Sequence, residues 1–357
     1  MNSLLKLNSF GQSIWLDFMR RDFVTGGALQ KLIKDDGLAG MTSNPSIFEK
    51  AMGGGNEYAN AIRALKEKGL GATEIYETLA IEDIRSAADL FKPVFEATEG
   101  LDGFVSLEVS PYLALDTAAT VAEARRLWKD VARPNLMVKV PGTTEGLPAI
   151  ELLTSQDINV NVTLLFSRHM YEQVAERYMA GLEHRAAEGL DIDRISSVAS
   201  FFVSRIDTAV DPLVPDALRG KTAIANAVLA YDSYKRIFSG VRWENLAEKG
   251  ARPQRLLWAS TSTKNPAYRD VMYVEELIGR NTVNTLPPAT LEAFREHGKP
   301  RASLEENVDA ARATLDEVAK HVSLEEITAK LTEEGVKQFS DAFDKLLAAV
   351  ESARKAA

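Results

Sequence analysis

The chain has 357 residues, of which 45% are hydrophobic and 26% charged, so it can bury a sizeable core and lacks the composition of a disordered protein. Its formal charge of −9 gives no general attraction to nucleic acid or to an anionic membrane, so an anionic ligand needs a local cationic pocket. The absence of cysteine excludes disulfides, cysteine-ligated metals and thiol nucleophiles. Residues 1–22 lack the apolar core of a signal peptide, and no window approaches ~18 uninterrupted apolar residues. We expect a cytoplasmic enzyme or binding protein without a membrane or nucleic-acid partner.

Short runs typical of β-strands alternate along the chain with longer segments of helical periodicity. The eight predicted strands are residues 13–19, 37–45, 104–111, 136–142, 158–167, 195–204, 255–261 and 281–287. The segments between them are too long for hairpins, so the strands should be parallel. This order predicts a (β/α)8 TIM barrel, with a doubly wound open sheet as the alternative. No glycine-rich nucleotide-binding motif favours the open sheet.

Additional helices are predicted around this barrel. Residues 46–100 form a long helical insertion between the second and third strands, and residues 205–254 form a similar one. Residues 288–357 read as C-terminal helices that pack on the barrel. Because no low-complexity linker or internal repeat divides the chain, we expect residues 1–357 to form a single domain.

A lysine interrupts the fourth predicted strand, "LMVKVPG". Leu136, Val138 and Val140 share one face of this strand, whereas Met137 and Lys139 share the other. The valines can pack under the helices, which directs Lys139 into the barrel. Lys139 then lies near the carboxyl end of its strand, where active sites of this fold are built.

Other strands place polar side chains at matching depths. Alternation sets the following residues opposite apolar neighbours: Asp17, Glu108, Asn161 and Thr163. Ser200 occupies a comparable late position, and Asn44 closes the second strand or, since it precedes Pro45, caps a turn or a helix. Polar groups inside a barrel are costly unless they serve a ligand, so their coincidence indicates a binding site.

Each of these residues also has a purely structural interpretation. A lysine in a strand is often half of a salt bridge, and Glu108 could neutralise Lys139. Asp17 could pair with Arg20 or Arg21. The hydroxyl and amide side chains could be structural hydrogen-bonding groups.

The chemistry open to this set is limited. The four histidines are scattered without the spacing of metal ligands, so no metal site is predicted, and no Ser-His-Asp arrangement is apparent. Burial lowers the pKa of a lysine and exposes a free amine that can form an imine with a carbonyl, while carboxyl groups move the protons. A buried lysine beside carboxylates therefore indicates covalent carbonyl chemistry.

Six segments resemble the transaldolase family across nearly the whole chain: "MTSNPSIFEKAM", "VSLEVSP", "VKVPGTTEG", "INVNVTLLFS", "SFFVSRID" and "GRNTVNTLPPATLEAF". The resemblance is to the longer bacterial branch, which is related to the transaldolase part of fusions with glucose-6-phosphate isomerase. It implies transfer of a dihydroxyacetone unit from sedoheptulose 7-phosphate to glyceraldehyde 3-phosphate, giving erythrose 4-phosphate and fructose 6-phosphate. No cofactor is implied, and the partners would be sugar phosphates.

The resemblance also implies a role for each site residue. Lys139 would be the Schiff-base lysine, Asp17 would exchange a proton with the C4 hydroxyl, and Glu108 would act as general acid and base through a water that Thr163 also holds. The other groups would bind the substrate. Asn44, Asn161 and Ser200 would hold the hydroxyls of its dihydroxyacetone part, Phe202 would form an apolar wall, and Arg205 would bind the phosphate.

The predicted phosphate site departs from the commoner branch of the family. That branch has a Ser-x-Arg step after the seventh strand, whereas this chain reads "WASTSTKNP". Ser260 matches the serine, and Lys264 would replace the arginine with a point charge in place of a planar fork. Ser262 could contribute instead.

Two alternative functions remain open at this stage. One is an aldolase resembling fructose-6-phosphate aldolase, and the other is a non-catalytic barrel that binds sugar phosphates. The second would not need Lys139, Asp17 and Glu108 together. A homodimer is compatible with the sequence, which does not determine the oligomeric state.

Overall fold

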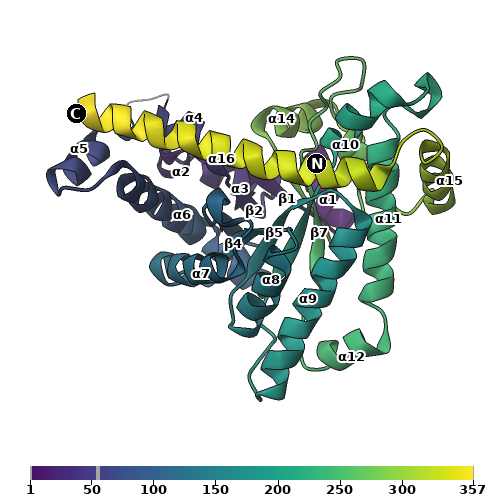
Figure 1. The fold of residues 1–357 in the computed structure, drawn as a ribbon, viewed down its shortest axis with the longest axis horizontal. Coiled ribbons are helices and arrows are strands. Elements are labelled where there is room, and N and C mark those ends of the chain that lie inside the picture. The colour runs from purple at the N-terminus through teal and green to yellow at the C-terminus, as the bar shows by residue number, and fades with distance from the viewer. Residues whose placement is uncertain (1, 54–56, 357) are drawn as a thin grey trace.

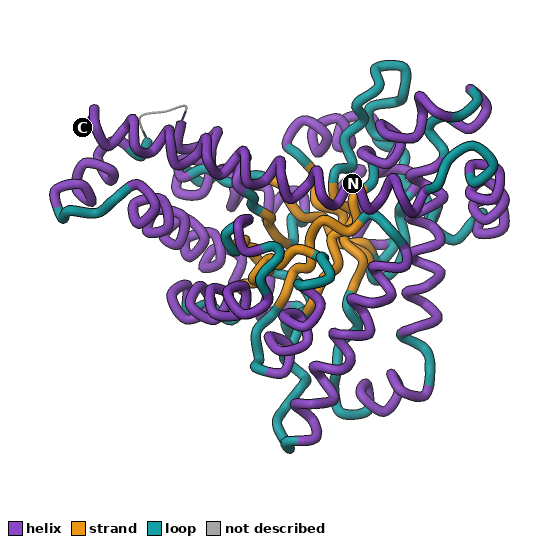
Figure 2. The backbone as a smooth tube through the Cα atoms, in the orientation of Figure 1, coloured by secondary structure: helices purple, strands orange, loops and turns teal. Residues whose placement is uncertain are grey.

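A computed structural model describes residues 2–53 and 57–356. Eight parallel strands close into a barrel in chain order, so the predicted (β/α)8 TIM barrel is confirmed (Figures 1 and 2). The strands are β1 Gln12–Asp17, β2 Gly40–Thr42, β3 Phe104–Glu108, β4 Leu136–Pro141, β5 Val160–Leu165, β6 Ser197–Phe202, β7 Arg255–Ala259 and β8 Thr282–Leu286.

The second strand is much shorter than predicted. Residues 37–45 were expected to be extended, but only Gly40–Thr42 pair with neighbouring strands. Gly37 adopts a left-handed conformation with φ of 68° and ends the preceding helix. Asn44 does not close the strand, because its side-chain oxygen accepts the Ile47 N–H at 3.0 Å and begins the next helix. The capping interpretation of Asn44 is therefore the correct one.

Helices surround the barrel on its outer side (Figure 1). Those up to β3 are α1 Ser3–Ser9, α2 Arg21–Thr25, α3 Ala28–Asp36, α4 Pro45–Gly53, α5 Ala59–Glu67 and α6 Ala72–Ala97. The next are α7 Thr117–Val131, α8 Gly146–Ser155, α9 Arg168–Ala187, α10 Ser204–Val210, α11 Thr222–Ile237 and α12 Val241–Ala247. The last are α13 Met272–Glu276, α14 Pro288–His297, α15 Val308–Val318 and α16 Leu324–Ala356. No helix among the described residues is both long enough and apolar enough to span a membrane.

The strand register explains why certain polar residues face inward together. Glu108 in β3 lies beside Lys139 in β4, which lies beside Asn161 in β5. The flanking Val138 and Val140 are fully buried, as expected for strands covered by helices. One row across three strands therefore carries an acid, a base and an amide into the barrel.

A buried ion pair ties strands together at the amino end of the barrel. Arg255 at the start of β7 contacts Asp102, which precedes β3, at 3.0 Å. Ser13 and Trp15 of β1 donate hydrogen bonds to the same carboxylate at 2.6 and 3.1 Å. Polar groups at this end of a TIM barrel serve stability, which leaves the carboxyl end for function.

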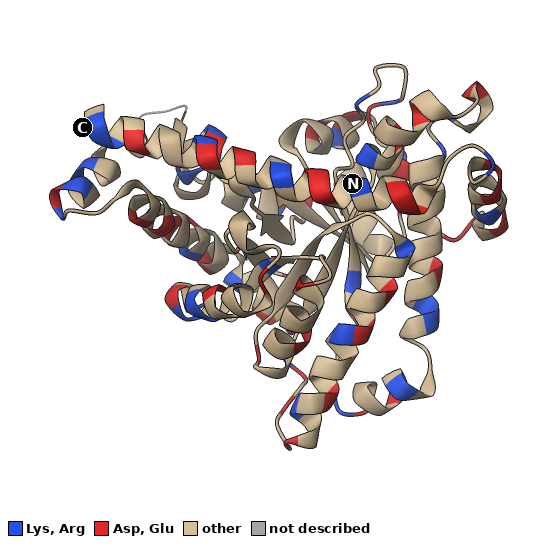
Figure 3. Ribbon diagram, viewed as in Figure 1, with Lys and Arg blue, Asp and Glu red and all other residues tan. Residues whose placement is uncertain are grey.

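The long helix α16 lies across the carboxyl end of the barrel. Figures 1 and 2 show it running over the strands, from the side of α15 to that of α4 and α5. A Cβ at Gly335 would lie 2.8 Å from the Leu164 side chain at the end of β5, so glycine permits this close approach. Figure 3 shows basic and acidic residues interspersed along α16. The helix therefore presents mixed charges outward and packs its apolar residues on the barrel mouth.

Candidate active site

Lys139 is almost completely buried at the centre of the carboxyl end. Its Nζ lies 3.2 Å from Glu108 Oε2 and donates a hydrogen bond to the Ser43 carbonyl at 3.0 Å. The neutralising pair that a structural interpretation predicted therefore exists. Both partners nevertheless lie toward the carboxyl ends of their strands, where active sites of this fold are built.

Asp17 ends β1 and lines the same cavity as Lys139. It accepts a hydrogen bond from Thr42 Oγ1 at 2.7 Å. It pairs with neither arginine considered as a partner, because Arg20 binds Asp22 and Arg21 binds Asp83 at 2.6 Å. The salt-bridge interpretation of Asp17 is thus wrong, and its carboxylate stays available to a ligand.

Burial determines the proton affinity of both carboxyl groups. It raises the pKa of Asp17, against the opposing effects of Lys139 and Thr42. It also raises the pKa of Glu108, against the opposing charge of Lys139. A carboxyl group whose pKa lies closer to neutrality exchanges protons more readily at physiological pH. The site thus holds two carboxyl groups suited to proton transfer.

An inner cavity of about 150 Å³ collects most of the predicted residues. Nine of the eleven line it: Asp17, Asn44, Lys139, Thr163, Ser200, Phe202, Arg205, Ser260 and Lys264. Ser262 lines it as well. Glu108 and Asn161 do not line it, but Glu108 contacts Lys139 and Asn161 accepts a hydrogen bond from Ser200. A set predicted from separate strands is therefore brought to one place.

Asn161 supports the cavity from below. Its Oδ1 accepts a hydrogen bond from Ser200 Oγ at 2.6 Å, and its Nδ2 donates one to Ser106 Oγ at 3.0 Å. Thr163 Oγ1 is buried and has no hydrogen-bond partner among the described residues. Asn161 thus orients Ser200, whereas Thr163 is free to bind a ligand or water.

The outer part of the cavity is cationic. Arg205 lies in the first turn of α10, and its guanidinium lies 5.2 Å from the centre of the Phe202 ring. Lys264 Nζ donates a hydrogen bond to Ser262 Oγ at 2.8 Å, so the two residues considered for the predicted phosphate site lie in contact. Ser260 Oγ lies 2.9 Å from Ser204 Oγ, and its backbone has a positive φ of 56°.

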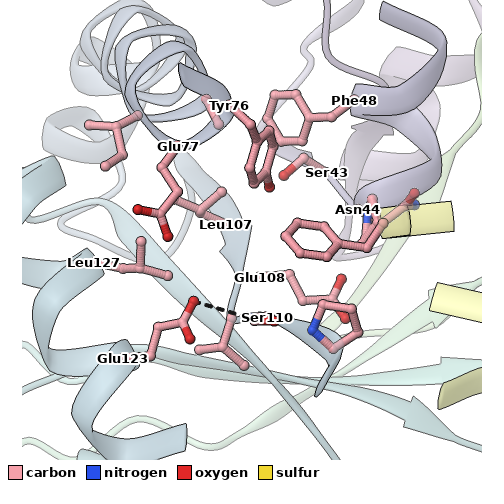
Figure 4. A pocket seen from close by; sticks show the side chains of 16 residues that line it. Ser43, Asn44, Phe48, Tyr76, Glu77, Leu107, Glu108, Ser110, Glu123 and Leu127 are labelled. Carbon is pink, nitrogen blue, oxygen red and sulfur yellow. Dashed lines mark hydrogen bonds between the residues drawn. The ribbon is translucent and has the colours of Figure 1, made fainter. Parts of the chain in front are cut away.

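A second, enclosed cavity of about 20 Å³ lies on the far side of Glu108. Figure 4 shows Glu108 at its edge, with Tyr76 and Glu77 of α6 opposite. Glu123 Oε1 accepts the Ser110 N–H at 3.1 Å on the same side. The cavity has room for about one water molecule. This side of Glu108 is therefore lined mainly by apolar residues, which fits the burial that raises the pKa of its carboxyl group.

Three further residues escaped the sequence analysis. Phe339 of α16 lines the inner cavity, with its ring centre 5.8 Å from Lys139 Nζ. No local pattern identifies a phenylalanine in an amphipathic helix as a lid over a distant lysine. Thr42 and Thr285, whose hydroxyls lie 2.7 Å apart, were within motifs already quoted but carried no distinguishing charge.

Known proteins resemble the chain over almost all its length. The family described as Transaldolase/Fructose-6-phosphate aldolase matches residues 14–350. A "Transaldolase" from Thiobacillus denitrificans is 51% identical, covering 98% of this chain and 100% of that protein. A "Transaldolase" from Trichodesmium erythraeum is 46% identical, covering 98% and 97%. A "Transaldolase" from Neisseria gonorrhoeae is 48% identical, covering 98% and 99%.

Proposed function

Because the chain belongs to the transaldolase/fructose-6-phosphate aldolase family and is an enzyme of the transferase class, we propose that it transfers a dihydroxyacetone unit through an imine on Lys139. The donor is sedoheptulose 7-phosphate and the acceptor glyceraldehyde 3-phosphate, giving erythrose 4-phosphate and fructose 6-phosphate. One observation carries the assignment: Lys139 is buried 3.2 Å from Glu108, beside a cavity that Asp17 also lines.

The first step joins Lys139 to the donor ketose. The amine attacks C2 of the ketose, the carbinolamine loses its oxygen as water, and the C=N bond forms. Glu108 is the group within reach to give and take the protons of this step, because its carboxylate contacts Lys139 Nζ. The Thr163 hydroxyl can hold the water that leaves and returns.

The second step breaks the C3–C4 bond. Asp17 takes the proton of the C4 hydroxyl, the C4 carbonyl forms, and the electron pair of the C3–C4 bond moves into the imine to give an enamine. Thr42, which donates to Asp17 at 2.7 Å, orients the carboxylate for this transfer. In the reverse sense, the enamine attacks the acceptor aldehyde and Asp17 returns the proton.

The three-carbon unit is transferred, and not released as free dihydroxyacetone, only if water does not protonate the enamine. Phe339 covers Lys139 from α16, and Phe202 forms a second apolar wall of the same cavity. These rings favour a transferase over a fructose-6-phosphate aldolase, and the full-length relatives named as transaldolases agree. The non-catalytic alternative is disfavoured by the family and by the Lys139, Asp17 and Glu108 set.

The remaining residues bind the rest of the sugar phosphate. Asn44 and Ser200 line the inner cavity at positions suited to the donor hydroxyls, with Asn161 acting through Ser200. Arg205 and Lys264 supply positive charge for the phosphate. The proposal includes a cytoplasmic homodimer without nucleic-acid or membrane partners. Cell fractionation and light scattering test its location and assembly.

Product analysis tests the function. Purified enzyme with sedoheptulose 7-phosphate and glyceraldehyde 3-phosphate should form erythrose 4-phosphate and fructose 6-phosphate in equal amounts, without metal or cofactor. Release of free dihydroxyacetone as the main product would identify an aldolase instead.

A further inference from the structure

The inner cavity opens into an outer one of about 520 Å³. Arg205 and Lys264 line both cavities, whereas Lys50 of α4 lines only the outer one. Lys50 lies on the same helix that Asn44 begins, so one helix contributes to both levels of the site. The sequence analysis assigned no role to this lysine.

The three cations are not held in ion pairs by the part of the chain that the structure describes. Lys50, Arg205 and Lys264 form no ion pair within residues 2–53 and 57–356. Of the nearby carboxylates, Asp17 is bound by Thr42, and Glu334, which affects Arg205, lies 3.7 Å from Lys330.

The cations are also close enough to repel one another. Burial, and then the positive charges of Arg205 and Lys50, lower the pKa of Lys264. Arg20 lines the same outer cavity but is paired with Asp22. The mutual repulsion of these clustered cations is relieved when an anion binds among them.

The substrates differ in how far their phosphate extends. With C2 of each ketose fixed on Lys139, the phosphate of the seven-carbon donor lies one carbon further out than that of the six-carbon donor. A phosphate that extends outward from Lys139 comes to Arg205 and Lys264 in the inner cavity. It comes to Lys50 only in the outer cavity. A lysine on a flexible stem suits an anion whose position varies between substrates.

We propose that Lys50 determines donor specificity by binding the phosphate of the seven-carbon ketose in the outer cavity, while Arg205 serves both donors. The proposal rests on the transaldolase function assigned above and adds a residue to its phosphate site. Lys50 is exposed, so its contribution is that of a screened ion pair and should weaken as salt rises.

The test compares Lys50→Gln, Lys50→Arg and a control, Lys31→Gln, which removes the same charge from an exposed lysine of α3 that lines neither cavity. Lys50→Gln should raise KM about fivefold for sedoheptulose 7-phosphate and less than twofold for fructose 6-phosphate, with kcat retained. Lys50→Arg should restore most of the selectivity, and Lys31→Gln should leave it unchanged. High salt should shrink the difference between the wild type and Lys50→Gln.

Equal effects of Lys50→Gln on the two donors, or no effect on either, would overturn the proposal. Borohydride trapping of each donor on Lys139 in the same variants separates this outcome from failure of the assigned function. An adduct without altered selectivity refutes only the role of Lys50, whereas no adduct with either donor in the wild type refutes the function itself.

Discussion

Phe339 gives the sharpest test of why this site should transfer its three-carbon unit and not release it. Phe339 and Phe343 are one turn apart on α16, and each is 6% exposed. Phe339 lines the substrate cavity over Lys139, whereas Phe343 packs on Tyr76 and borders the cavity behind Glu108. The substitutions Phe339→Ala and Phe343→Ala therefore remove equally buried rings with different access to the enamine.

The two variants should lose similar stability. Replacing a buried phenylalanine by alanine costs roughly 3–5 kcal/mol. An unfolding entropy of ~2.1 cal/mol/K per residue gives ~0.75 kcal/mol/K for 357 residues, so Tm should fall by about 4–7 °C in each variant. Similar Tm values would show that the pair is matched in structural damage.

Only Phe339→Ala should change the fate of the enamine. The assay measures glyceraldehyde 3-phosphate released from fructose 6-phosphate, first without acceptor and then with erythrose 4-phosphate. Removing the ring admits water to the enamine, so the ratio of the acceptor-free rate to the transfer rate should rise about tenfold, the equivalent of ~1.4 kcal/mol. It should stay near the wild-type ratio in Phe343→Ala. An unchanged ratio in Phe339→Ala, or the same rise in both, would refute water exclusion by this residue.

The remaining predictions concern proton transfer, phosphate binding and pH. Asp17→Asn should preserve imine formation but slow C–C cleavage by ~10²-fold or more, whereas Glu108→Gln should slow imine formation and hydrolysis by a similar factor. Rapid-quench trapping of the imine separates these steps. Small and equal effects of the two substitutions would favour purely structural roles for both carboxyl groups. Arg205→Ala should raise KM for phosphorylated donors by about ten- to hundredfold, and Lys264→Ala should raise it less. The KM for unphosphorylated dihydroxyacetone, the control donor, should not change. An unchanged KM for phosphorylated donors in Lys264→Ala would mean that the serines and the backbone bind the phosphate instead. Burial raises the pKa of Asp207 from 3.8 to about 6. Between about pH 4 and pH 6 the folded state therefore binds more protons than the unfolded state. The free energy of unfolding should fall by roughly 3 kcal/mol through this group as pH rises across that range. Asp207→Asn should remove that part of the slope in urea unfolding at a series of pH values, and an identical slope in both proteins would contradict it.

Alternation along single strands predicted the centre of the site. Alternation within each strand directs Lys139, Glu108 and Asn161 into the barrel. The register of the strands then places these three residues side by side at one depth along the barrel axis. This prediction works because successive side chains in a strand point to opposite faces whatever the surrounding fold. The sequence alone therefore predicts that Glu108, Lys139 and Asn161 point into the barrel.

Features formed by distant segments were beyond the same reasoning. Asp17 was given a possible arginine partner, but both neighbouring arginines are held by other carboxylates. Phe339 reaches Lys139 only because α16 crosses the barrel mouth. The Arg21–Asp83 pair and the contact of Phe339 with Lys139 depend on tertiary packing that no local periodicity encodes.

The most direct test of the whole account is borohydride reduction in the presence of fructose 6-phosphate, followed by peptide mass spectrometry. The account predicts a covalent sugar-derived adduct on Lys139, and none in Lys139→Arg, because a guanidinium stays protonated and does not form the imine. An adduct on a different lysine, or full transferase activity with no adduct at Lys139, would contradict it.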